Sequence, residues 1–193
     1  MGRAASGASS GVAAAAALLA LSACASGPAP LTDATVVYST IVETNYTPSE
    51  VGAAASLGLP VEVVGAPPDG ASPEEVAAQL RAPQSFGGRP MALAAQGSEG
   101  PRLVVAFGSL GRGSLCTGEA RGTVDAGPTL DAAVAYCFDD VLSSSAFVAS
   151  RVTQGPRDAG FAAAMMQAVR EVLPIRNPAL DSGRDRPRVR PPR

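Results

Sequence analysis

The chain has 193 residues, of which 46% are hydrophobic but only 4% aromatic, and its 15 basic residues, all arginine, stand against 17 acidic ones. It contains no histidine and no lysine, so it has neither an imidazole base nor an amine that could form a Schiff base or hold a phosphate. Serine-hydrolase triads, Ser-x-x-Lys dyads and P-loop nucleotide sites are therefore excluded.

The first 24 residues have the three zones of an export signal. Arg3 provides a positive start, residues 11–21 are apolar, and the small residues Ser22 and Ala23 precede Cys24. The apolar stretch is shorter than the about 20 residues that a membrane span requires. At all four positions, Leu21-Ser22-Ala23-Cys24 resembles the lipobox of bacterial lipoproteins.

This resemblance implies that residues 1–23 are a signal peptide and that Cys24 is lipidated, receiving a diacylglycerol and becoming the mature N-terminus, with palmitate among its acyl chains. The alternative is an ordinary secretory signal cut at Ala23-Cys24-Ala25. Both interpretations predict a location in the cell envelope, and the first predicts a lipid anchor in the membrane facing the periplasm. No aspartate follows Cys24, which by resemblance to enterobacterial sorting favours the outer membrane.

Residues 24–30 are small and proline-rich and predict a tether, after which residues 31–178 can form one domain with its own core. We predict strands over 34–42, 59–64, 102–107, 130–138 and 146–152, and a strand or an apolar turn over 90–95. The β-branched residues of 34–42 favour a central strand. The last two strands are expected to pair as a hairpin.

Three helices are predicted. Thr47-Pro48-Ser49-Glu50 and Ser72-Pro73-Glu74-Glu75 both have the pattern of a capping box with proline at the first helical position. Gly58 should end the first of these helices, and the second should end near Arg81 and Pro83. Residues 158–173 are amphipathic, and their Phe and Met side chains predict core packing rather than a binding groove. The expected fold is α+β, with a mostly antiparallel sheet and helices packed on one face.

Cys116 and Cys137 remain once Cys24 is assigned to the lipid. An oxidising compartment favours a disulfide between them, which would attach the glycine-rich segment after residue 107 to the strand at 130–138. The chain has no C-x-x-C motif and no histidine or lysine that could activate a thiol, so we expect a structural bond and not a redox-active one.

The glycine-rich loop 108–114 is a weak candidate for ligand binding. It could present backbone N–H groups to an anion, but its spacing fits neither a P-loop nor a dinucleotide fingerprint, and a surface loop is the simpler interpretation. Its candidate residues are Gly108, Ser109, Gly111, Arg112 and Gly113.

Carboxylates are the remaining acid–base groups. Glu74 and Glu75 suit a helix N-terminus, and Asp139 and Asp140 suit a hairpin turn, so no catalytic residue is assigned. Neither a metal site nor a cofactor is expected, since no EF-hand spacing is present.

Residues 179–193 are rich in arginine and proline and predict a disordered tail with five arginines. Residues 24–180 carry nine arginines and fifteen acids, so a basic tail follows an acidic body. The tail could contact anionic lipid or lipopolysaccharide. The alternatives are a solubilising role or an intramolecular contact with the acidic body.

The order of five segments, 63–67, 102–107, 115–116, 135–137 and 161–173, resembles that in small uncharacterised exported proteins and lipoproteins, and implies no known activity. We expect a non-enzymatic envelope lipoprotein that binds an envelope protein or component. Nucleic acid is not an expected partner because the domain is acidic. A periplasmic small-ligand or anion-binding module that uses loop 108–114 is the alternative.

Overall fold

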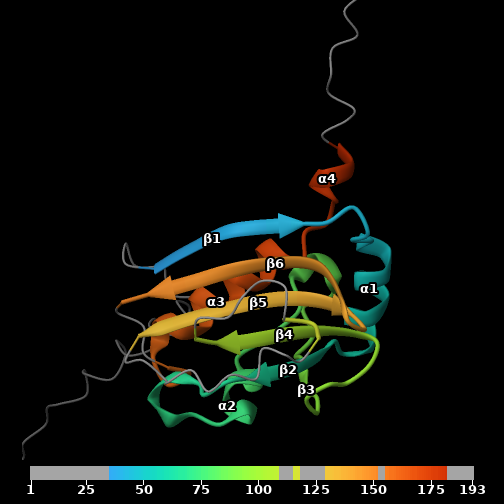
Figure 1. Ribbon diagram of the computed structural model, residues 1–193. Coiled ribbons are helices and arrows are strands. Elements are labelled where there is room, and N and C mark those ends of the chain that lie inside the picture. Colours follow the sequence, from blue (N-terminus) through green and yellow to red (C-terminus); the bar gives the residue numbers. More distant parts are fainter. Residues whose placement is uncertain (1–34, 109–114, 118–128, 152–154, 182–193) are drawn as a thin grey trace, which may run out of the picture.

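The computed structural model describes residues 35–108, 115–117, 129–151 and 155–181, and Figure 1 shows their arrangement. The predicted signal peptide, Cys24 and the tether lie outside these residues. The described residues form one α+β domain around a mixed sheet of six strands in the order β1-β6-β5-β4-β2-β3. The strands are β1 (Thr35–Val42), β2 (Pro60–Val64), β3 (Ala92–Leu93), β4 (Pro101–Phe107), β5 (Leu130–Phe138) and β6 (Val141–Ser150).

The sheet is antiparallel from β1 through β6 and β5 to β4, whereas β2 runs parallel to both of its neighbours, β4 and β3. The prediction that residues 34–42 form a central strand is wrong, because β1 ends the row of described strands and pairs with β6 there. Dense β-branched side chains indicate that a segment is extended, but they do not determine how many neighbours it has.

The hairpin of β5 and β6 is confirmed, with Asp139 and Asp140 as its two-residue turn. β6 begins at Val141, five residues before the predicted start. The intervening residues include Ser143, Ser144 and Ser145, which are all buried within the strand. Three consecutive serines resemble a loop in the sequence, but here strand pairing satisfies their backbone groups, and Ser144 Oγ donates to the carbonyl oxygen of Val172.

The helices are α1 (Pro48–Leu57), α2 (Pro73–Ala78), α3 (Ala159–Val172) and the short α4 (Pro178–Asp181), together with two 3-10 turns, Pro68–Gly70 and Gln84–Phe86. The capping box at Ser72 is confirmed, since Ser72 Oγ accepts from the backbone N–H of Glu75, whose carboxylate accepts from the N–H of Ser72. The box at Thr47 is wrong, because Thr47 Oγ1 donates to the carbonyl oxygen of Asn45 instead. α2 ends at Ala78, earlier than predicted.

Alternating side chains divide the sheet residues between two apolar clusters. The larger lies on the face that carries the helices, where α3 packs on β6, β1 and β5 and contributes its predicted Phe and Met side chains, Phe161 and Met165. The smaller cluster lies on the other face and includes Leu115 and Cys116 from the connection between β4 and β5. Its other buried members are Val64, Val104, Ala106, Ala133, Ala135 and Cys137. The helices therefore cover one face, as predicted.

Gly65, which follows β2 and belongs to the segment 63–67, occupies a position that only glycine fits. Its φ is +80°, and a Cβ built there would lie 2.6 Å from the carbonyl oxygen of Phe107 on β4. Both the positive φ and the close approach of two backbones exclude a side chain. A larger residue at this position would separate the ends of β2 and β4.

Tyr46 and Asn177 connect the C-terminal segment to the β1–α1 turn. Tyr46 Oη donates to the carbonyl oxygen of Pro174 at 2.8 Å, and its ring meets that of Tyr136 edge-on at 6.0 Å. Asn177 Nδ2 donates to the carbonyl oxygens of Glu43 and Tyr46. The last described residues, 179–181, thus belong to a helix next to a fixed segment, although the predicted tail included them.

Replacing tyrosine by phenylalanine should affect stability differently at Tyr46 and at Tyr136. Tyr46→Phe removes a buried hydrogen bond and leaves the Pro174 carbonyl without that donor, so the free energy of unfolding should fall by about 1 kcal/mol. The Oη atom of Tyr136 is buried and has no hydrogen-bond partner, so Tyr136→Phe should leave stability unchanged or raise it. Urea titrations of both variants measure the difference, and an equal loss for the two would contradict the assignment.

Candidate functional site

The face of the sheet opposite the helices, which we call the outer face, carries a buried ion pair between Arg102 of β4 and Glu62 of β2. Arg102 Nε lies 2.9 Å from Glu62 Oε2, and both side chains are only 3% exposed. The two residues occupy outward-facing positions of neighbouring strands, in line with Val104 and Val64 of the smaller apolar cluster. A charged pair in this position must be fully hydrogen-bonded, because desolvation of each charge costs several kcal/mol.

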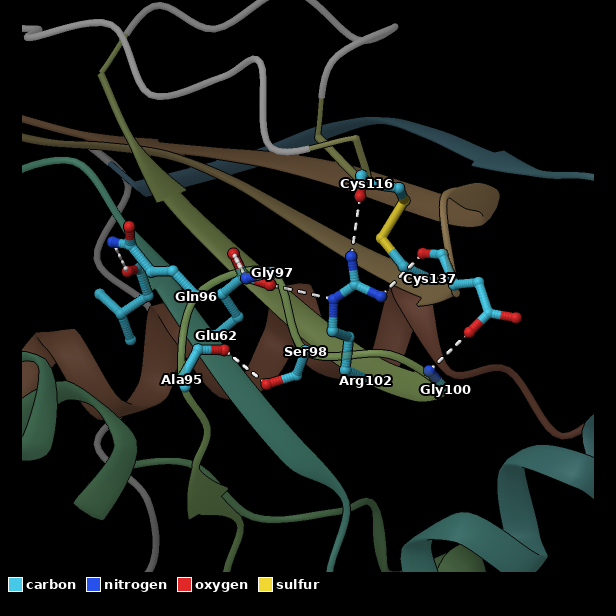
Figure 2. A network of polar contacts seen from close by, with 11 residues as sticks. Glu62, Ala95, Gln96, Gly97, Ser98, Gly100, Arg102, Cys116 and Cys137 are labelled. Carbon is cyan, nitrogen blue, oxygen red and sulfur yellow. Dashed lines mark hydrogen bonds and ion pairs between the residues drawn. A yellow bond between two sulfur atoms is a disulfide. The ribbon is translucent and has the colours of Figure 1, made fainter.

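The guanidinium of Arg102 also binds two backbone carbonyl groups (Figure 2). Nη1 donates to the carbonyl oxygen of Asp139, in the β5–β6 turn, and Nη2 donates to that of Cys116, each at 2.7 Å. One side chain of β4 therefore connects strand β2, the hairpin turn and the segment 115–117, which are separated in the sequence.

The carboxylate of Glu62 is held from its other side by the β3–β4 connection. Glu62 Oε1 accepts from the backbone N–H of Gly97 at 3.0 Å, and Gln96 Nε2 donates to the carbonyl oxygen of Val63 at 3.2 Å. A second contact fixes the hairpin turn, because Asp139 Oδ1 accepts from the N–H of Gly100 at 2.7 Å. Figure 2 shows these bonds as one continuous network that crosses the outer face.

The predicted disulfide between Cys116 and Cys137 is confirmed and lies beside this network. The Cα atoms are 5.6 Å apart, and the two cysteines are buried at 3% and 0% exposure. The bond attaches the segment 115–117 to β5 at the residue paired with Arg102 across the sheet. The covalent bond and the arginine thus hold the same segment from two sides.

Arg102 and Glu62 are each 2% exposed, and each meets the other and backbone groups. Both side chains are thus engaged with each other and with backbone groups, and their burial leaves them almost inaccessible to a solute. The network is therefore a structural clamp.

Most residues of the weak ligand-loop hypothesis lie outside the described residues. These are Ser109, Gly111, Arg112 and Gly113. Gly108 is described, has a φ of +93°, and donates its N–H to the carbonyl oxygen of Asp131. Cys24 also lies outside the described part of the chain, so its lipidation stays a prediction.

The candidate carboxylates have the local roles that their sequence contexts predict. Glu75 completes the capping box and pairs with Arg157 at 2.9 Å, and the hydrogen bonds from the Ser72 backbone and from Arg157 lower the pKa of Glu75. The pKa of Glu74 is lowered by its own backbone N–H and by Ser72. Asp139 forms the turn with a φ of +50°. Within the described ranges, no three His, Cys, Asp or Glu side chains form a group that could hold a metal ion.

No protein-family model, curated protein or solved structure matches this chain. In the part of the chain that the structure describes, no helix has the length and apolar character to cross a membrane.

The clamp was not identified from the sequence, because Arg102 and Glu62 are single charges in otherwise apolar strands. The segments 61–64 and 102–107 contain one charged residue each, and the β2–β4 register, which pairs Glu62 with Val104, makes Arg102 a diagonal neighbour of Glu62 on the same face of the sheet. A single charge in each of two buried strands, with opposite signs, is the signal that could have suggested the pair.

Removal of one partner of the clamp should destabilise the domain more than removal of both. Arg102→Met leaves the Glu62 carboxylate buried without its counter-ion and should lower the free energy of unfolding by about 3–5 kcal/mol. The double variant Glu62→Leu/Arg102→Met should be more stable than Arg102→Met alone. Denaturant titrations measure both values, and a double variant at least as unstable as the single one would contradict the clamp.

Arg157→Met is the matched control for this experiment. It removes the exposed pair with Glu75, in which the side chains are 65% and 39% exposed, so it should change the unfolding transition little.

Loss of the disulfide should lower stability by about 3 kcal/mol in the chain-entropy model, because the bond closes a loop between residues 21 positions apart. Cys116→Ala/Cys137→Ala measures this loss in denaturant titrations. The unsubstituted protein in reductant should show the same loss. Mass spectrometry of the unreduced protein should find no free thiol at either position, and two free thiols there would contradict the pairing.

Proposed function

We propose that this chain is a lipid-anchored protein of the bacterial cell envelope whose folded domain binds another envelope component without catalysis. The lipobox-like segment that ends at Cys24 predicts the anchor. The proposal then requires an extracytoplasmic domain that begins soon after this cysteine.

The observation that carries the proposal is the buried disulfide Cys116–Cys137. Structural disulfides persist in oxidising compartments and are rare in the reducing cytosol. This one closes the smaller apolar cluster and leaves both cysteines almost inaccessible to solvent. A domain that depends on such a bond is best suited to the periplasm, in agreement with the export signal.

The position of the first described residue also supports the proposal. Thr35 begins β1 at one end of the sheet, only eleven positions after Cys24. A fully extended linker of eleven residues spans at most about 40 Å, so a lipid at Cys24 would keep this end of the domain near the bilayer. Figure 1 shows that α4 lies toward the other end of the sheet. The end that carries the hairpin turn would therefore be directed away from the membrane.

The side chains that the sequence offers favour binding over catalysis. The chain has neither imidazole nor amine groups, and the fold uses its buried charged pair as a clamp. The described Glu75 and Asp139 carboxylates are likewise engaged in a helix cap and a turn.

Lipidation at Cys24 can be tested in a bacterial host supplied with an alkyne-labelled palmitate analogue. We expect the protein to incorporate the label and to enter the detergent phase of a two-phase extraction, whereas Cys24→Ala should lose the label. Ser26→Ala is the matched control and should behave as the unsubstituted protein. An unlabelled protein that retains residues 1–23 in the cytosol would refute the proposal.

A further inference from the structure

The end of the sheet remote from the start of β1 exposes apolar side chains among carboxylates. We call this surface the distal end and define it by residues 43–50, 138–141 and 174–181. Its exposed apolar residues are Phe138 at 46%, Val141 at 54%, Ile175 at 62% and Leu180 at 58%. Its exposed acids are Glu43, Glu50, Asp139, Asp140 and Asp181.

Hydrogen bonds hold the three segments of the distal end together. The N–H of Glu43 donates to the carbonyl oxygen of Ser143 at 2.9 Å, which joins the β1–α1 turn to β6. Asn177 joins the same turn to the C-terminal segment through bonds of 2.9 and 2.8 Å. The exposed groups are therefore presented by a fixed surface, and a ligand would not have to order it first.

A buried polar atom without a partner lies beneath this surface. Tyr136 is 3% exposed, and its Oη makes no hydrogen bond. Burial, and then the nearby Glu50 carboxylate, raise the pKa of Tyr136 to about 12. The Glu50 carboxylate therefore lies near this buried hydroxyl and is itself exposed, without a described counter-ion.

The charges of the distal end favour a basic occupant. The five exposed acids of the distal end outnumber its exposed arginine, Arg176, even when the nearby exposed Arg170 of α3 is counted with it. Phe138 and Val141 face each other across the hairpin next to Asp139 and Asp140. A planar guanidinium can stack on an aromatic ring while it pairs with a carboxylate, so arginine suits this mixture better than lysine.

The chain itself supplies such a segment directly after α4. Residues 182–193 contain Arg184, Arg186, Arg188, Arg190 and Arg193, with Val189, three prolines and a single acid. They begin at Asp181, on the distal end. Twelve residues reach up to about 43 Å when extended, whereas β1 and β5 are separated by only two strand spacings, about 10 Å.

We propose that residues 184–193 dock on the distal end of their own domain, with arginines at Glu50 and Asp140 and apolar groups over Phe138 and Val141. The segment then pairs with acids of the distal end and covers its exposed apolar side chains. This contact does not depend on the lipid anchor, because it needs only the folded domain and its C-terminal residues.

The test compares two ¹⁵N-labelled forms of the mature chain, both carrying Cys24→Ser and oxidised in the periplasm. One ends at Arg193 and the other at Asp181. We expect their amide shifts to differ at residues 43–50 and 138–141. A synthetic peptide of residues 182–193 should restore these shifts in the shorter form, and about 0.5 M salt should abolish the effect by screening.

Charge variants of the shorter form locate the contact. Glu50→Gln/Asp140→Asn should weaken peptide binding by about tenfold, as expected for two exposed charge pairs. Asp131→Asn/Glu74→Gln removes two exposed charges at the other end and should leave binding unchanged. Circular dichroism and an intact disulfide confirm that each variant is folded.

Three results would overturn the proposal. The first is identical spectra of the two forms, with no response to the peptide. The second is shifts that appear only at high protein concentration, which would mean that the segment binds a second copy. The third is a tail that binds anionic vesicles while the distal end of the domain is unaffected by its presence.

Discussion

The outer face of this domain depends on one buried arginine. Arg102 carries its charge into an apolar sheet. An N–H group of its guanidinium that is buried without a hydrogen-bond acceptor would cost free energy. Glu62 supplies the counter-charge, and the carbonyl groups of Cys116 and Asp139 supply the remaining described acceptors. These acceptors come from three separate segments, so the geometry of the arginine requires that all three assemble.

The two faces of the sheet are stabilised in different ways. Helices cover the inner face with a broad apolar cluster that contains Phe161, Met165 and Leu80. The outer face has a smaller cluster of mainly small side chains, and the segment 115–117 lies on it. The described members of this cluster are fewer than those of the inner cluster, and hydrophobic stabilisation scales with the apolar area buried. The disulfide and the clamp compensate by fixing the segment covalently and electrostatically.

This division leaves the ends of the sheet available for interaction. The helices cover one face of the sheet, and the clamp and the disulfide lie on the other. The turns at the distal end, in contrast, expose acids and apolar side chains to solvent. If the domain is anchored through Cys24, the end that carries Thr35 stays near the bilayer, and the distal end is where a partner can approach. The proposed docking of residues 184–193 would use that surface.

Local signals in the sequence predicted the elements that depend on short-range chemistry. The capping box of Ser72 and Glu75, the amphipathic spacing of 159–172 and the turn at Asp139 and Asp140 involve residues close in the chain, so their patterns could be identified directly. The disulfide was predictable because only two cysteines remained after Cys24 was assigned to the lipid. Thr47 was a wrong prediction, since its hydroxyl found the nearby Asn45 carbonyl instead.

The tertiary structure decided the features that depend on distant neighbours. The order of strands placed β1 at the end of the sheet, and the pairing of β6 with both β1 and β5 turned Ser143, Ser144 and Ser145 into buried strand residues. The register of β2 against β4 brought Glu62 to Arg102. Propensity and capping act over a few residues and are visible in the chain. The partner of a buried charge depends on how distant strands pack, and here the two charged residues are 40 positions apart in the sequence.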